Sequence, residues 1–362
     1  MEKKLQTFNS FIKLITLILL ITSLIKPIYS KPTTCNQTSQ NNSGDKKQAL
    51  HYKIAAIISI LTSSAAGICI PLASKNSNAL HPDSGIHFLA KSFAAGVILA
   101  TGFIHILPDA FESLTSPCLA GEDGRAWADG FPVAGLVGMI AAIGTFLIEG
   151  FAAGHHKRME LRKAQPVIGD EEVEMNSGSN DVVGPVGAIL MIQRSEESHL
   201  IRSRVISQIL EVGIVIHSII IGISLGATQR PSTIKPLIAA LSFHQFFEGI
   251  GLGGCISQAR FTFRGIVIMV LFFALTAPTG IVVGIGISSV YDENSHTSLI
   301  VEGILNSASA GILIYMALVD LMAPDIMNSK LQTNAKLQVS SFSMLVMGAF
   351  CMAFLAKLEI MN

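Results

Sequence analysis

Two histidines and one glutamate have the residue types and the spacing of metal ligands, although each lies in an otherwise apolar stretch. His244 and Glu248 are four residues apart, so a helix would place them one turn apart on the same face. His217 lies in the preceding apolar stretch, where it can supply a third ligand. Imidazole and carboxylate groups suit zinc, ferrous iron or manganese, whereas a cuprous site would need sulfur ligands. The pattern predicts a divalent-metal site; simple hydrogen bonding of the two histidines between helices is the alternative.

A second group of polar residues forms a stripe in an earlier apolar stretch. His105, Asp109 and Glu112 follow i, i+4, i+7 spacing, which places them on one face of a helix. Such a stripe would collect a hydrated cation and lead it inward, although a solvated helix end also explains Glu112. Glu302 and Asn306, again one turn apart, add a polar pair to a later apolar stretch. We therefore expect these five residues to line the entrance pathway of the metal.

The composition is that of a membrane protein. Half of the residues are hydrophobic, only 14% are charged and the mean hydropathy is +0.55, whereas soluble domains have about 25% charged residues. The formal net charge is zero and no basic face interleaved with aromatic residues is apparent, so no nucleic-acid partner is expected. We expect the chain to lie in a lipid bilayer, where each ionisable side chain is a functional candidate because its burial in lipid is costly.

Eight apolar stretches have the length of about 20 residues that a bilayer core requires. They are residues 52–74, 87–107, 131–153, 205–228, 234–256, 265–290, 299–323 and 339–356. The alternation of β-barrel strands is absent, and small residues recur within the stretches, as in helices packed in lipid. The predicted fold is an all-α, polytopic membrane protein with eight transmembrane helices in a domain that covers residues 52–362. Lys91, Glu149 and Glu211 lie near the ends of their stretches, where we expect water to reach them.

The N-terminal residues predict a secretory signal peptide over residues 1–30. Two lysines precede an apolar run, and a helix breaker, Pro27, follows it; an uncleaved first span is the alternative. Residues 31–51 would then form an extracytosolic tail. Both Asn-x-Ser/Thr sequons of the chain, at Asn36 and Asn41, lie in this tail, which predicts a glycoprotein.

The distribution of basic residues predicts the orientation of the spans. The connection 154–204 carries seven lysines and arginines, which places it in the cytosol as a variable loop. Its polar composition predicts a largely disordered linker. An even number of spans then puts both termini outside. Cys35 and Cys118 would share the outer side and can pair there, but two free thiols are the alternative.

The apolar stretches that carry these polar residues resemble the plant-type branch of the ZIP family (Zrt/Irt-like proteins), which transports zinc and iron. HSIIIGISLG, from His217 to Gly226, is similar to the fourth-helix signature of that family. HQFFEG, from His244 to Gly249, is similar to its fifth-helix signature. The resemblance extends from Cys35 over nearly the whole remaining chain and includes eight spans with both ends outside.

The resemblance implies both a site and an activity. The transport site would comprise His217, Ser218, His244, Gln245 and Glu248, with His105 and Asp109 on the entrance side. Zinc or ferrous iron would enter the cytosol by alternating access, and the plasma membrane is the expected location. The metal would be a substrate rather than a permanently bound cofactor, and a homodimer is a further expectation.

Two other functional classes use similar residues. An intramembrane metal-dependent hydrolase would need a general base beside its metal, as in His-Glu-x-x-His, and that motif is absent. A non-transporting metal receptor would need an output module, for which residues 154–204 offer no recognisable motif. We therefore expect a transporter rather than an enzyme. The residue types do not select among zinc, iron, manganese and cadmium, nor do they identify a coupling ion.

Overall fold

The computed structural model describes residues 43–73, 84–119, 130–163, 185–229, 231–288 and 295–360. Within these ranges the chain is helical and contains no strand, which confirms the predicted all-α class. The signal peptide and the asparagines of both sequons lie outside the described residues.

Most of the helices are long, and several are continuous with one another. In chain order they are α2 (Ser43–Ala73), α3 (Gly85–Ala100), the π-helical η3 (Thr101–Ile106), α4 (Leu107–Leu114), the short η4 (Pro117–Leu119), α5 (Val133–Lys163), α6 (Pro185–Ala227), α7 (Pro231–Gln258), α8 (Phe263–Ile287), α9 (His296–Tyr315), the π-helical η6 (Met316–Met322), α10 (Ala323–Ile326), α11 (Ser329–Thr333) and α12 (Ala335–Ile360).

Seven helical stretches in the described part of the chain are long and apolar enough to cross a membrane. They are Lys47–Ala73, Gly85–Leu119, Val133–Phe151, Ser203–Ala227, Phe263–Ile287, His296–Ile326 and Ala335–Lys357. The predicted fifth span corresponds to α7, which has 28 residues. Its length suffices, but His244, Gln245 and Glu248 lower the hydropathy of its middle. The chain is therefore a multi-pass membrane protein, and its eighth crossing stays a prediction.

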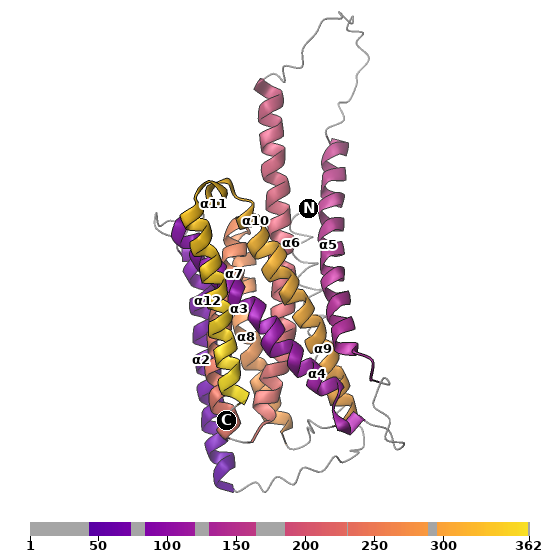
Figure 1. Ribbon diagram of the computed structural model, residues 1–362, viewed down its shortest axis with the longest axis vertical. Helices are drawn as coiled ribbons and strands as arrows, with labels where there is room; N and C mark the ends of the chain where they lie inside the picture. The colour runs from indigo at the N-terminus through magenta and orange to yellow at the C-terminus, as the bar shows by residue number, and fades with distance from the viewer. Residues whose placement is uncertain are drawn as a thin grey trace, which may run out of the picture.

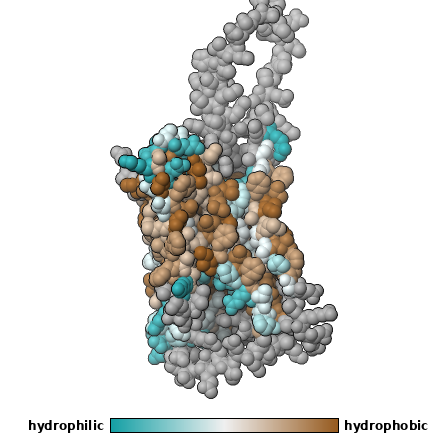
Figure 2. Space-filling view, viewed as in Figure 1, coloured by the Kyte–Doolittle hydropathy of each residue, from teal (hydrophilic) through white to brown (hydrophobic). Residues whose placement is uncertain are grey.

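The long helices lie side by side in one bundle (Figure 1). The start of α2 and the end of α12 lie at one end, which we call the C-terminal end. The opposite end carries α11, and we call it the α11 end. Figure 2 shows a broad apolar band across the visible face of the bundle, with hydrophilic side chains gathered toward its two ends. Exposed aromatic side chains such as Phe146 and Phe350 belong to a surface suited to lipid.

Two helices extend farther than the apolar stretches that predict them. α5 continues to Lys163 and α6 begins at Pro185, and both project beyond the bundle at the α11 end (Figure 1). The prediction of a linker without regular structure is therefore wrong for residues 154–163 and 185–204. Once a helix exists, extending it fixes only one residue per added hydrogen bond, so a helix readily continues past its apolar part.

Glycines allow the helices that carry the predicted metal ligands to pack backbone against backbone. A Cβ atom on Gly222 of α6 would lie 2.6 Å from the carbonyl oxygen of Ala277 in α8, and one on Gly280 would lie 2.8 Å from the Ile219 oxygen. On α7, a Cβ atom on Gly253 would lie 2.6 Å from the Ile68 oxygen of α2. Since no side chain fits in these gaps, glycine is required for such close contact in lipid. These contacts fix α6 and α7 within the bundle.

Two spans share a pattern in which a π-helical segment is followed, after one intervening residue, by a Pro-Asp pair. η3 leads into Pro108 and Asp109, and η6 leads into Pro324 and Asp325. A proline ring clashes with the carbonyl group four residues earlier in an α-helix, and a wider π turn relieves that clash. The two spans run in opposite directions (Figure 1). The two aspartates therefore occupy equivalent places toward opposite ends of the bundle.

The cysteines differ in their states. Cys118, after α4, is disulfide-bonded, whereas Cys69, Cys255 and Cys351 are free. Cys35, the partner that the sequence suggests for Cys118, lies outside the described residues. A disulfide beside α4 is consistent with an oxidising compartment at the C-terminal end of the bundle.

Candidate metal centre

α6 and α7 bring the three predicted metal ligands into the interior of the bundle. His217 of α6 and His244 of α7 are buried, and their ring centroids lie 5.7 Å apart. Glu248 lies one turn after His244 on α7 and is fully buried. The helical spacing thus places an imidazole and a carboxylate on one face of α7, while α6 supplies the second imidazole.

The two further residues that the family resemblance implies connect the same two helices. Ser218 and Gln245 are both buried, and the Ser218 hydroxyl donates a long hydrogen bond of 3.5 Å to Gln245 Oε1. Each directly follows one of the histidines in the chain. The Gln245 amide nitrogen makes no hydrogen bond within the described structure. This neutral pair therefore adds an oxygen-rich edge to the histidine cluster.

His105 of η3 completes a triangle of imidazole rings. Its ring centroid lies 6.0 Å from that of His217 and 5.8 Å from that of His244. These distances are close to the 5.7 Å between the His217 and His244 rings. The sequence placed His105 on the entrance pathway because its stripe leads to a helix end. In the structure it is buried among the predicted ligands, where it joins the entrance stripe to the centre.

The buried polar atoms of this cluster have unused capacity to bind an ion. Neither ring nitrogen of His217 or His244, and neither carboxylate oxygen of Glu248, has a hydrogen-bond partner among the described residues. Leaving such a group unsatisfied costs about 1–3 kcal/mol, and more when the group is charged. No three His, Cys, Asp or Glu side chains in the described ranges stand in the geometry that holds a metal ion. Binding would therefore require small movements of the rings and the carboxylate.

The other predicted pathway residues become more buried with depth. Along α4 and η3, Glu112 is exposed, Asp109 is half-buried and His105 is buried. On the neighbouring α9, Glu302 is half-buried and Asn306 is buried, and the Asn306 amide oxygen has no partner in the described structure. Both series lead inward from the C-terminal end of the bundle. This is the arrangement expected of an entrance that takes a hydrated cation toward the histidines.

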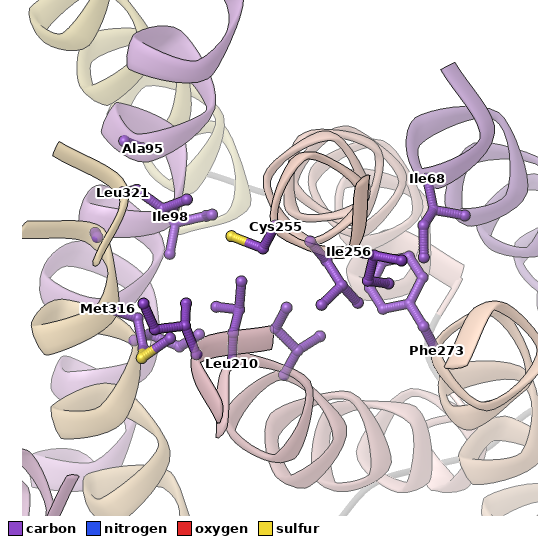
Figure 3. Packing of buried hydrophobic residues seen from close by; sticks show 14 of the residues in the cluster. Ile68, Ala95, Ile98, Leu210, Cys255, Ile256, Phe273, Met316 and Leu321 are labelled. Atoms are coloured by element: carbon purple, nitrogen blue, oxygen red, sulfur yellow. The ribbon is translucent and has the colours of Figure 1, made fainter. Parts of the chain in front are cut away.

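A layer of apolar side chains lies on the α11 side of the centre. Ile98, Leu210 and Ile256 are fully buried in one cluster (Figure 3). Each lies seven or eight residues from His105, His217 or Glu248 on its own helix, which is about 11 Å toward the α11 end. The described structure thus offers an ion polar groups on the C-terminal side of the centre and an apolar barrier on the other.

Burial corrects one expectation about charged residues near the ends of the spans. Lys91 and Glu211 are buried rather than hydrated, and Glu149 accepts a hydrogen bond of 3.1 Å from the Tyr315 hydroxyl. Lys91 forms an ion pair with Asp325, whose carboxylate oxygen lies 2.8 Å from the lysine nitrogen. Reasoning from the sequence missed this pair. Its only signals were a lysine inside an apolar stretch and the second Pro-Asp pair.

Comparison with known proteins shows which proteins the chain is similar to. A family model described as ZIP Zinc transporter matches residues 50–356. Among curated proteins, the chain is 48% identical over 344 residues to "Zinc transporter 3" of Oryza sativa subsp. japonica, with 91% of this chain and 94% of the relative covered.

Other relatives are named for zinc or for iron. "Zinc transporter 5" of Oryza sativa subsp. japonica is 45% identical over 347 residues, which cover 95% of this chain and 97% of the relative. "Fe(2+) transport protein 1" of the same organism is 43% identical over 323 residues, which cover 86% of this chain and 85% of the relative.

Proposed function

The chain belongs to the ZIP family of zinc transporters, and from this premise we propose that it carries Zn²⁺ or Fe²⁺ into the cytosol through the His217, His244 and Glu248 centre. It is a multi-pass membrane transporter of metal ions rather than an enzyme. The observation that carries the proposal is the cluster of buried polar atoms without hydrogen-bond partners among the described residues, on helices fixed by glycine contacts. An ion is the ligand that such a cluster suits.

The mechanism follows from ligand exchange. A hydrated ion would exchange its waters for imidazole nitrogens and the Glu248 carboxylate, and Ser218 and Gln245 would supply neutral oxygen atoms beside them. Binding must stay weak enough for release, so a centre that is not arranged for ideal coordination at rest suits a transporter. Release then needs the apolar layer around Ile98 to open, which alternating access provides by rearrangement of the helices.

The direction of transport rests on the orientation of the spans. We take α7, the predicted fifth span in chain order, to cross the membrane as well, which makes eight spans. It lies within the bundle and packs closely against α2. The basic residues of the connection 154–204 support a cytosolic location of the α11 end, and the disulfide of Cys118 fits an outer location of the C-terminal end. The entrance stripe then faces outside, and the ion moves inward. Together with the signal peptide that the sequence predicts, this orientation leads us to propose the plasma membrane as the location.

Uptake of metal by proteoliposomes that contain only this protein tests the proposed function. We expect Zn²⁺ and Fe²⁺ to enter along their gradients without nucleotide, because the sequence has no Gly-x-x-x-x-Gly-Lys-Ser/Thr motif. A receptor that only senses metal would bind the ion without accumulating it in the vesicles. Binding without uptake would therefore contradict transport and favour that second class.

Asp109→Ala is expected to change the apparent affinity for metal before it stops transport. Asp109 is half-buried on the entrance side of His105, so the ion contacts it only in passing. We expect KM for Zn²⁺ to rise by about tenfold, the effect of about 1.4 kcal/mol, while kcat changes little. Initial uptake rates over a range of Zn²⁺ and Fe²⁺ concentrations measure both constants. A lost kcat with an unchanged KM would instead place Asp109 in the centre itself.

A further inference from the structure

A buried ion pair joins α3 to α10 toward the α11 end of the bundle. The Lys91 nitrogen lies 2.8 Å from Asp325 Oδ1, and the two residues are 7% and 8% exposed. Stability alone explains such a pair poorly, because its desolvation costs about as much as its attraction contributes. The other carboxylate oxygen, Oδ2, has no hydrogen-bond partner in the described structure. The Asp325 carboxylate therefore retains capacity to bind a second cation.

The pair lies beyond the apolar layer, as seen from the metal centre. Lys91 precedes His105 by 14 residues on a continuous helical span, which is about 20 Å toward the α11 end. Figure 3 shows the Cys255 thiol pointing from α7 toward Ile98 within the apolar layer. The thiol packs in one buried cluster with Leu321 of η6, which directly follows the buried Asp320.

These groups are suited to a divalent ion that has passed the apolar layer. Asp320 and Asp325 offer carboxylates and Cys255 offers a thiol, all of which are zinc ligands. Asp325 also occupies the place after η6 that Asp109 occupies after η3. Because the two spans run in opposite directions, one Pro-Asp pair lies toward the entrance and the other toward the exit. The two ends differ in that the aspartate toward the exit, Asp325, forms an ion pair with Lys91.

We propose that Lys91 is a tethered competitor for the leaving ion. Its ammonium group occupies Asp325 and prevents Asp320, Asp325 and Cys255 from trapping a divalent ion at the cytosolic end of the pathway. An arriving ion displaces Lys91 from Asp325, and the return of Lys91 releases the ion into the cytosol. The assignment of this end as the exit rests on the proposed function. These three side chains, like those of the histidine centre, do not stand in metal-binding geometry in the described structure, so an ion would have to draw them together. Without the competitor, the two carboxylates and the thiol would then bind the ion tightly and release it slowly.

Lys91→Met tests this role by removing the competitor and leaving Asp325 in place. We expect the purified, full-length variant to bind about one Zn²⁺ per chain more than the unaltered protein, and its uptake into proteoliposomes to fall about tenfold, because a tighter exit site retards release. The double variant Lys91→Met/Asp325→Asn should lose the additional Zn²⁺ and recover uptake to within about twofold of the unaltered chain. Lys91→Arg keeps the cation and should behave as the unaltered chain does.

Lys53→Met is the matched control. Lys53 is also a buried lysine within a span. It lies in the first half of α2, whose start is at the C-terminal end of the bundle, whereas Asp325 lies toward the α11 end. Its replacement should change neither the Zn²⁺ stoichiometry nor the uptake rate. An additional Zn²⁺ in Lys53→Met as well would show that loss of any buried lysine has this effect, and the proposal would fail.

A purely structural ion pair predicts a different result. Lys91→Met would then lower the melting temperature without binding an additional Zn²⁺, and the double variant would restore stability alone; this outcome overturns the proposal. If Lys91→Met does not fold, Lys91→Gln is used in its place. If neither single variant folds but the double variant does, the ion pair has a structural role and the proposal is overturned. An unaltered protein without uptake contradicts the proposed function instead, while the Zn²⁺ stoichiometry of the variants still decides the role of Lys91.

Discussion

Glu248→Gln is expected to abolish most metal uptake while the protein still folds and reaches its membrane. The substitution keeps the size of the side chain and removes its charge. In the buried centre the carboxylate is the anionic ligand that offsets the charge of the ion, and an amide oxygen replaces it poorly. We expect the initial rates of Zn²⁺ and Fe²⁺ uptake to fall by at least about tenfold, or about 1.4 kcal/mol.

Glu149→Gln is the matched control for this change. Glu149 is also a carboxylate within a span, but it is half-buried, accepts a hydrogen bond from Tyr315 and lies on α5, which carries none of the three clustered histidines. Its replacement should leave uptake within about twofold, because the amide oxygen of glutamine can still accept the Tyr315 hydrogen bond and the ion is not expected to bind at this position. Uptake is compared at equal amounts of folded protein in the vesicles. Near-normal uptake by Glu248→Gln would contradict the assignment of the metal centre.

His217→Ala is expected to stop uptake as fully as Glu248→Gln does. The two residues lie on different helices but are predicted to bind the same ion, so loss of either should disable the same step. Residues that act as a unit are strongly non-additive. The double variant His217→Ala/Glu248→Gln should therefore be little worse than either single variant. Initial uptake rates of the three variants give the coupling between the two positions.

Independent structural roles would give a different pattern in the same measurement. If His217 only formed hydrogen bonds between helices, its loss would lower thermal stability and its effect on uptake would multiply with that of Glu248→Gln. Additive free energies of the two single changes would thus contradict a shared ion.

Local periodicity explains how much of the centre the sequence could predict. The four-residue spacing of His244 and Glu248 places them on one face of any helix, and the structure has both on α7. The sequence also predicted that His217 lies beside these two residues, because a polar side chain in a membrane span is costly unless it contacts another polar group or an ion. Seven of the predicted spans correspond to helices in the described part of the chain that are long and apolar enough to cross a membrane, as hydropathy alone predicts. α7 is the exception because its ligands reduce the apolar character that identifies a span.

Tertiary contacts explain what the sequence could not predict. His105 looked like part of an entrance because it shares a helix face with Asp109, and only the packing of η3 beside α6 and α7 reveals its proximity to the other rings. Lys91 and Asp325 are separated by 234 residues, a distance over which helical spacing carries no information. The π segments were predictable in part, since a proline inside a span requires a local change in helix geometry.

X-ray absorption at the zinc edge of Zn²⁺-loaded protein tests the central claim most directly, because it reports the atoms bound to the ion. The account predicts nitrogen and oxygen ligands at about 2.0–2.2 Å, with the outer-shell pattern of imidazole and without sulfur. His217→Ala should remove part of the imidazole signal, and Glu248→Gln part of the oxygen signal. Sulfur ligands at about 2.3 Å, or a spectrum that neither substitution changes, would contradict the assignment of the His217, His244 and Glu248 centre.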